Sequence, residues 1–255
     1  MTSFPAILQS EWTKIRSVRS TVWTLALTFV ATAGLGALLS LLTNNNFQEF
    51  TRNDKTPFDA TGTAFSGIIL GELAIIVFGV LAVGNEYSTG MIRVTLAAVP
   101  QRGTLLTGKA VVLGGLAFLV ALVTAFVTFF LGQALLGDHS TDLGQPHVLR
   151  AVLGAALYLT MICLFSAGVT AMLHNQTLAL GVLVPFFFLL SPILSAVPKV
   201  RTLAHYFPDY AGSRMLLVFE QNDQPYGPWA GFAICLAWTL AALVGGALVL
   251  KNRDA

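Results

Sequence analysis

The chain has 255 residues, of which 55% are hydrophobic and only 10% are charged, whereas soluble domains carry about 25% charged side chains. This composition excludes an ordinary soluble enzyme, and the net charge of +2 with scattered lysines and arginines excludes the basic surface that nucleic-acid binding needs. Cys163 and Cys235 both lie inside apolar runs, where we expect them to pack as small hydrophobes.

Residues 1–20 precede the first long apolar run and form an arm whose part 4–20 has helical periodicity. One stripe of that helix consists of Phe4, Leu8, Trp12 and Ile15. The cations of the arm are Lys14, Arg16 and Arg19. We expect an amphipathic helix in the membrane plane, with Trp12 at headgroup depth and the cations near anionic lipid. A second interpretation makes it an elbow helix that also meets a cytosolic partner.

Six apolar runs are long enough to cross about 30 Å of hydrocarbon, which takes about 20 helical residues. They are residues 21–42, 61–84, 110–136, 151–173, 177–197 and 229–250. Strands of this length would have to close into a barrel, and the runs lack the alternation that a barrel requires. The predicted fold class is therefore all-α: a polytopic membrane protein with six transmembrane helices in one domain over residues 1–255. The first run is too long for a typical signal peptide, so we expect it to stay in place.

Glu72 is the one formal charge in the middle of a predicted span. An ionisable group there costs several kcal/mol unless it is paired, protonated or hydrated, so Glu72 should face protein or water. One interpretation is an acid of the substrate pathway that contacts a cationic or amphiphilic substrate, and the other is a hydrogen-bonded packing residue. Gly67 and Gly71 in the same span lie four residues apart, which lets another helix backbone approach closely.

The connection between the second and third spans reads Asn85-Glu86-Tyr87-Ser88-Thr89-Gly90-Met91-Ile92-Arg93 and continues to Pro100-Gln101-Arg102. Gly90 allows a break after the span, residues 91–99 are apolar enough for a short helix, and Pro100 stops it. The pattern predicts a short helix held just below the membrane.

Residues 103–110 nearly match the phosphate-binding P-loop. Such a loop needs a preceding strand, a Ser or Thr hydroxyl for magnesium and a soluble sheet behind it, but here Ala110 has no hydroxyl and the chain enters the membrane. If ATP drives this protein, another polypeptide hydrolyses it.

The loop after the third span contains four residues of metal-binding type, Asp138, His139, Asp142 and His147. Their spacing matches no rigid metal site, so we expect a solvated polar loop and no metal.

The fifth span contains Pro185 and Pro192, which remove backbone hydrogen bonds and kink or interrupt a helix. Lipid does not tolerate a broken helix on its own, so these prolines indicate a protein-lined or watery environment and join Glu72 as candidate pathway residues. A mobile gate and a static kink both remain open.

Residues 198–228 form a long external connection in which we expect Asp209 to cap a helix over 210–220. Its apolar residues need cover, which predicts a re-entrant or lid-like external segment. In the last span, Ala237, Ala241 and Gly245 form a small-residue stripe that we expect to be a packing face.

The distribution of lysine and arginine predicts which side is cytosolic. Eight cations lie in the arm, the loop between spans two and three, and the tail: Lys14, Arg16, Arg19, Arg93, Arg102, Lys109, Lys251 and Arg253. The opposite connections are longer and hold six cations together with eight acids. We therefore expect both termini in the cytosol.

Two sequence patterns resemble the permeases of bacterial type-2 ABC exporters, and the opening is similar to that of many actinobacterial members. One is Glu86-Tyr87-Ser88-Thr89-Gly90-Met91-Ile92-Arg93 after span two, and the other is Ser10-Glu11-Trp12-Thr13-Lys14-Ile15-Arg16-Ser17. The resemblance covers the whole chain in span count, arm, loop placement and long external loop.

The resemblance implies that the loop after span two is a cytosolic coupling helix, which docks in a groove of a separate ATPase. The residues carried over to this role are Glu86, Tyr87, Gly90, Arg93 and Arg102. It also implies two ATPase copies, a permease homodimer with spans two and five at the pathway, and short external helices that close its outer end. ATP and magnesium would bind in the partner, with no cofactor in this chain. The alternative is that Glu86 and Arg93 merely solvate a turn.

These observations predict the non-catalytic permease subunit of an exporter in the bacterial plasma membrane. An ion-coupled secondary transporter would normally show internal repeats and several buried ionisable groups, and this chain offers Glu72 alone. A membrane-embedded lipid-modifying enzyme would need a cluster of catalytic groups at membrane depth, and none is visible. The substrate stays open among lipid, drug, peptide antibiotic and glycan precursor.

Overall fold

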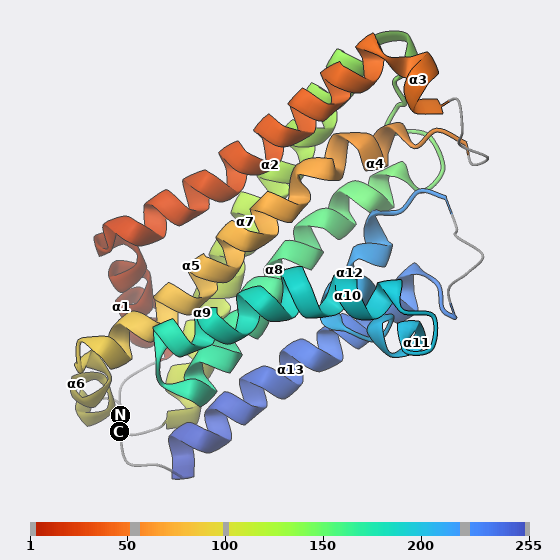
Figure 1. The fold of residues 1–255 in the computed structure, drawn as a ribbon. Helices are drawn as coiled ribbons and strands as arrows, with labels where there is room; N and C mark the ends of the chain where they lie inside the picture. The colour runs from red at the N-terminus through yellow and green to blue at the C-terminus, as the bar shows by residue number, and fades with distance from the viewer. Residues whose placement is uncertain (1–3, 52–56, 99–101, 220–224, 253–255) are drawn as a thin grey trace.

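The computed structural model describes residues 4–51, 57–98, 102–219 and 225–252 (Figure 1). Within these ranges the secondary structure is entirely helical, and six helical stretches are long and apolar enough to cross a membrane. The prediction of an all-α polytopic membrane protein is confirmed.

Six stretches form the bundle, and two of them are interrupted. The uninterrupted ones are α2 (Arg19–Asn45), α7 (Arg102–Leu136), α8 (Val148–Leu173) and α13 (Pro228–Asn252). The second stretch runs through α4 (Ala60–Ala64), η1 (Phe65–Gly67) and α5 (Ile68–Ser88), and the fifth through α9 (Gln176–Pro185), the π-helical η3 (Phe186–Leu190) and α10 (Ser191–Ala196). α7 starts at Arg102 rather than at residue 110, so residues 103–110 form helical turns and not a phosphate-binding loop.

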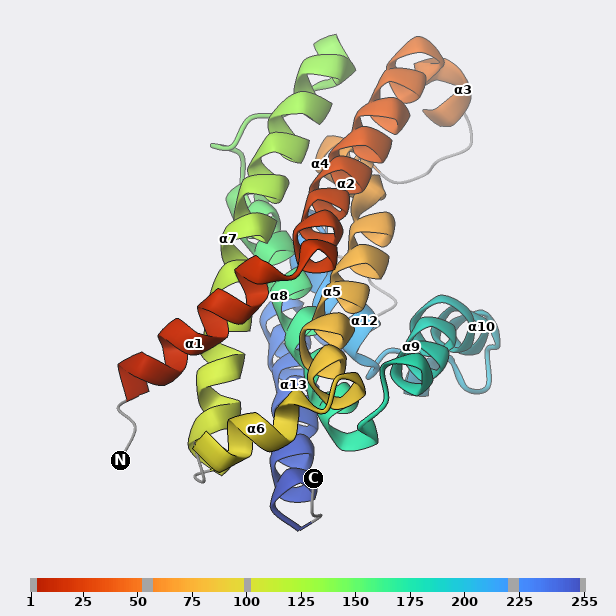
Figure 2. The same ribbon diagram turned by 90° about the vertical axis from the view of Figure 1, so that its left-hand side faces the viewer.

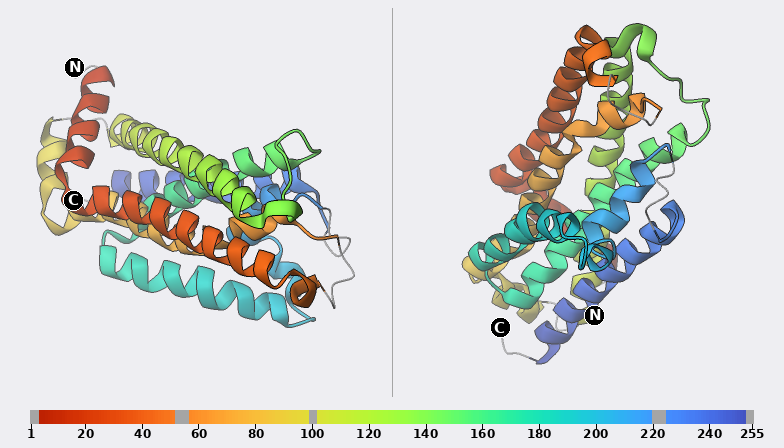
Figure 3. Two further views of the ribbon diagram at one scale, coloured as in Figure 1. Left: turned by 90° about the horizontal axis from the view of Figure 1, so that it is seen from above. Right: turned by 45° about the vertical axis from the view of Figure 1, so that its right-hand side comes forward.

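α5 and α8 form the centre of the bundle, because they bury a larger share of their residues than the other long helices. α8 packs along α13, α7 and α5, while α2 packs along α5 and α7. Phe78, Ile75 and Ile162 are fully buried between them. α9 and α10 lie at the margin of the bundle (Figure 3).

Short helices lie at both ends of the bundle. α1 (Phe4–Ser17) and α6 (Met91–Ala98) cross one end, where the last turns of α13 also lie (Figures 1 and 2). The opposite end carries α3 (Phe47–Thr51), η2 (Gly137–His139), α11 (Arg201–Ala204), α12 (Pro208–Ser213) and η4 (Arg214–Leu216). We call these the α6 end and the α12 end.

Small residues set the close approach of α2 and the second stretch. A Cβ added to Gly67 would meet the backbone of Thr32 and Gly36, and one added to Gly71 would meet the Thr32 hydroxyl. The glycine pair predicted as a packing face therefore packs within one chain.

The stripe expected in the last span packs as predicted only at Gly245, where an added Cβ would lie 2.6 Å from Met172 Sδ of α8. Ala237 and Ala241 are exposed. α13 instead buries another stripe, made of Cys235, Thr239, Ala242 and Gly246. Gly168 in α8 explains the choice, because a Cβ there would lie 2.6 Å from the carbonyl carbon of Ala242. Several faces of α13 carry small residues, so its own sequence does not decide which face is buried. Gly168 of α8 decides it.

The break predicted in the fifth span lies between its two prolines. Pro185 ends α9, the π-helical turns follow, and Pro192 stands near the start of α10. Pro192 has no N–H to donate to the preceding turn, and the wider π turn accommodates the missing bond. Both prolines are exposed in the single chain.

The helix predicted over 210–220 with Asp209 as its cap is wrong. α12 begins at Pro208 after Phe207, so Asp209 lies in its first turn, and the helix ends at Ser213. Proline favours the first helical position because its fixed φ suits the helix and its missing N–H costs nothing there. Met215 and Leu216 are nevertheless buried, as their apolar character required.

Replacing Gly67 with valine should lower the free energy of unfolding by about 1–3 kcal/mol, because the added side chain forces α2 away from the second stretch. The matched control is Gly34→Val in α2, where an added Cβ meets nothing within 4 Å. Thermal unfolding of both variants in detergent measures the difference. Equal melting temperatures would contradict the close approach.

Candidate coupling site at the α6 end

α6 is separated from α5 by Thr89 and Gly90. Gly90 has a φ of 69°, and its N–H donates to the carbonyl of Tyr87. This left-handed conformation favours glycine and ends helices. The break predicted at Gly90 is therefore present, and it turns α6 across the end of the bundle (Figure 2).

α6 presents an uncovered apolar face. Ile92 is buried against the bundle, while Met91 and Val94 are 43% and 70% exposed. An exposed valine and methionine on a short helix beside the main bundle form a small apolar patch that another protein can cover.

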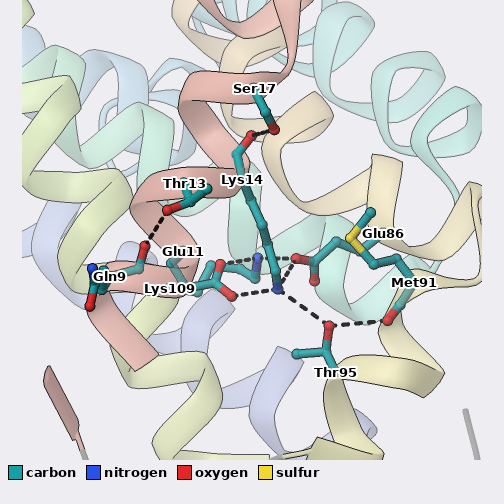
Figure 4. A network of polar contacts seen from close by, with 9 residues as sticks. All are labelled: Gln9, Glu11, Thr13, Lys14, Ser17, Glu86, Met91, Thr95 and Lys109. Carbon is teal, nitrogen blue, oxygen red and sulfur yellow. Dashed lines mark hydrogen bonds and ion pairs between the residues drawn. The ribbon is translucent and has the colours of Figure 1, made fainter. Parts of the chain in front are cut away.

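Beside α6, four charged side chains form a closed ring (Figure 4). Lys14 Nζ lies 2.7 Å from Glu11 Oε1 and 2.8 Å from Glu86 Oε1. Lys109 Nζ lies 2.5 Å from Glu11 Oε2 and 2.8 Å from Glu86 Oε1. Each lysine thus bridges both carboxylates, and Lys14 also donates to Thr95 Oγ1 in α6 at 3.3 Å. We call Glu11, Lys14, Glu86 and Lys109 the charge ring.

The charge ring is electrically balanced and largely removed from water. Glu11 is 1% exposed, and Glu86 and Lys109 are also buried. Burial lowers the pKa of the Lys14 amine. Hydrogen bonds and attraction to Glu11 and Glu86 together raise this pKa by more than burial lowers it, so it lies above the ordinary value. Lys14 is therefore charged at neutral pH. Two cations facing two carboxylates satisfy the requirement that a buried charge be paired.

A cavity of about 320 Å³ lies next to the ring. Its lining comes from α1, the start of α2, the end of α5, α6 and the start of α7, and includes Lys14, Val18, Leu81, Glu86 and Met91. Both charged and apolar side chains line the cavity. Because it lies between the arm and the end of α5, these two elements are not packed tightly against each other.

The residues predicted for coupling have different environments. Glu86 is buried in the ring and so does not solvate a turn. Tyr87 meets the ring of His174 edge to face at 4.5 Å, and Gly90 makes the turn. Arg93 lies in α6 and Arg102 begins α7, but their side chains lie outside what the structure describes.

In the arm, Trp12, Arg16 and Arg19 are exposed, as an interfacial helix requires. Lys14, which we expected near lipid headgroups, instead points into the charge ring. The buried face of α1 is Ile7, Glu11 and Ile15. The predicted apolar stripe is thus mostly the outer face, since of its members Phe4 and Trp12 are exposed and only Ile15 is buried.

Sequence reasoning missed Glu11 and Lys109 as site residues. The spacing of Glu11 and Lys14, three apart on a helix, was the available local signal. Lys109 is 98 positions from Glu11, and no local pattern joins residues so far apart. The expectation that acidic and basic side chains at the same end of a membrane bundle form ion pairs would have suggested the contact between Glu11 and Lys109.

A second polar cluster lies towards the α12 end, around Glu72. Glu72 is 8% exposed, and its carboxyl group lies beside the Tyr158 side chain and faces Asp209 of α12. Glu72 Oε1 is buried without a hydrogen-bond partner among the described residues, as is Asp209 Oδ1. Glu72 therefore faces protein, as predicted, and not lipid.

Asp209 ties α12 to the end of the fifth stretch. The Ser191 hydroxyl donates to its carboxylate, and the Tyr210 hydroxyl donates to Ser195 Oγ at 2.6 Å. Burial raises the pKa of Asp209 to about 6, although the Ser191 hydrogen bond opposes this shift. α12 is thus held against α10 and above Glu72.

Asp138, Asp142 and His147 in the connection after α7 are exposed, as a solvated polar loop requires, whereas His139 is partly buried. Its ring stacks on Phe47 with centroids 3.4 Å apart and an angle of 4°. His147 has a φ of 70° and precedes α8.

Six helical stretches long and apolar enough to cross a membrane define a multi-pass membrane protein. A family model described as ABC-2 family transporter protein matches residues 7–194. The chain belongs to this family, which makes it a permease of an ABC-type transporter and implies, in general, a partner ATP-binding subunit. A comparison with curated proteins found no match.

Replacing Lys109 with methionine should lower the free energy of unfolding by about 3–5 kcal/mol, because two buried carboxylates then share one cation. The matched control, Lys199→Met, removes an exposed lysine at the α12 end and should change it by less than about 1 kcal/mol. Thermal unfolding followed by size-exclusion chromatography measures both. A Lys109→Met protein as stable as the control would refute the ring's role in holding α1, α5 and α7 together.

Proposed function

We propose that this chain is the permease subunit of an ATP-driven exporter, and that α6 docks on a separate cytosolic ATPase. The α6 end then faces the cytosol, with both termini on that side of the bacterial plasma membrane. Hydrolysis belongs to the partner, which binds ATP and magnesium, and this chain supplies the route for substrate.

The exposed apolar face of α6 carries the proposal. A helix of eight residues that turned its apolar side to water would lose the benefit of burial, about 25 cal/mol for each Å². Met91 and Val94 therefore need a cover, and in an ABC-type permease the ATP-binding subunit supplies one. Gly90 and the contact of Lys14 with Thr95 keep α6 beside the end of the bundle, which a docking helix requires.

The substrate route is proposed to run past Glu72, where a second copy of the permease completes it. Support comes from the fifth stretch, whose Val182, Leu189 and Ile193 are more than half exposed in the single chain. Pro185 and Pro192 also lie uncovered on it. A homodimer that covers this face would give the broken helix the protein-lined surroundings that its backbone needs. Two ATPase copies follow from the twofold symmetry, and α12 then closes the outer end as a lid.

Replacing Val94 with aspartate should remove the partner ATPase from the purified complex, because a charge in an apolar contact must be desolvated without a counter-ion. The matched control is Leu203→Asp, which places the same charge at an equally exposed leucine of α11. Affinity purification with quantitative mass spectrometry measures the ATPase-to-permease ratio. We expect a loss of about tenfold or more, equivalent to about 1.4 kcal/mol. Equal ratios in both variants would reject docking through α6.

Replacing Glu72 with glutamine tests the pathway. The variant keeps the shape of the side chain but replaces a carboxyl group, which can become negatively charged beside a cation, with a neutral amide. Stimulation of ATP hydrolysis by lipophilic cations should therefore fall, while stimulation by neutral amphiphiles persists. Glu49→Gln, at an exposed carboxylate of α3, is the control. If Glu72→Gln leaves both classes of compound equally stimulating, Glu72 is a packing residue.

A further inference from the structure

The charge ring joins three elements that come from distant parts of the chain. Glu11 and Lys14 belong to α1, Glu86 to the last turn of α5, and Lys109 to the start of α7. Lys14 adds the contact with Thr95 in α6. One set of polar contacts therefore touches the arm, both helices beside Gly90, and α7 (Figure 4).

The arm is attached to its neighbours in two different ways. α1 packs directly on α7, where a Cβ added to Gly108 would lie 2.7 Å from Ile7 Cγ2. Between α1 and the end of α5 lies the cavity of about 320 Å³, and Lys14 spans the gap to Glu86 by charge. α5 is thus linked to the arm by an ionic contact beside a void.

Such a contact suits the transmission of movement. Buried opposite charges resist separation strongly, because pulling them apart leaves each without a counter-ion in a poorly solvated place. The void, meanwhile, leaves room for α5 and α6 to tilt without a collision between packed side chains. α1, α5 and α6 therefore stay connected when one of them is pulled away, but their relative tilt can change.

We propose that the charge ring is a clamp that carries movement of α6 to the arm and to α7. The inference rests on the proposed function, because it needs an ATPase that moves α6. Lys14 is the central member, since it contacts Glu11 on its own helix, Glu86 in α5 and Thr95 in α6. The four ring members are positioning residues that act through α6.

The test uses a charge-balanced double variant in the complex with the ATPase that copurifies with the native chain. Lys14→Met together with Glu86→Gln removes one cation and one carboxylate, so the Glu11–Lys109 pair stays neutral. The docking face of α6 is untouched. The control, Arg16→Met with Glu49→Gln, removes an exposed cation of the same arm and an exposed carboxylate of α3.

Pulsed electron paramagnetic resonance measures the distance between spin labels attached to cysteines that replace Gln9 on α1 and Trp229 at the start of α13, both exposed positions. It is recorded without nucleotide and with ATP plus vanadate. In the native complex and the control, trapping the nucleotide should redistribute this distance. In the clamp variant the change in the ratio of the two populations should fall by at least about fivefold, the lower bound of typical coupling between sites.

A milder variant protects the test against misfolding. Thr95→Val removes the contact of Lys14 with α6 and leaves all four charges of the ring in place, so it should fold normally and reduce the redistribution less.

The outcomes separate the two proposals. If the ATPase stays bound to the clamp variant and the distances redistribute as in the native complex, the clamp is overturned. If the ATPase leaves the clamp variant but not the control, the ring belongs to the docking surface, which also overturns it. If no ATPase copurifies with the native chain, the proposed function fails and the clamp fails with it.

Discussion

The structure depends on one constraint: charged side chains that are buried together at the α6 end of the bundle must be paired with opposite charges. Glu11, Glu86 and Lys109 are buried, and each alone would destabilise the fold by several kcal/mol. Together with Lys14 they are neutral and satisfied. The ring joins α1 to the last turn of α5 and to the second turn of α7. Gly90 follows Glu86 by four residues, and its left-handed φ sets the direction in which α6 leaves.

Helices and breaks were largely predictable because they follow from local physics. Runs of apolar residues give spans, Gly90 gives a left-handed turn, and the two prolines of the fifth stretch give an interrupted helix. α12 shows the limit of such reasoning, since Asp209 and Pro208 are both good helix-starting residues and the sequence alone does not rank them. The structure uses the proline, which frees Asp209 to accept from Ser191.

The candidate site was harder to predict because its partners are far apart in sequence. Glu86 and Gly90 could be singled out from their place after a span. The contact of Lys109 with Glu11 depends on how α1 lies on α7, which the sequence pattern of neither helix determines. The same holds for α13, whose small residues offer several possible faces, and Gly168 of α8 selects among them. In both cases the deciding residue lies on the neighbouring helix.

Cys163 and Cys235 have a practical consequence for work on this chain. Both are free and buried. The backbone of Cys163 in α8 lies against Gly79 of α5, and the sulfur of Cys235 in α13 lies beside Gly212 of α12. A water-soluble thiol reagent reaches neither sulfur while these helices stay packed, so the rate at which each thiol is modified reports how often the helices around it separate, without any engineered probe.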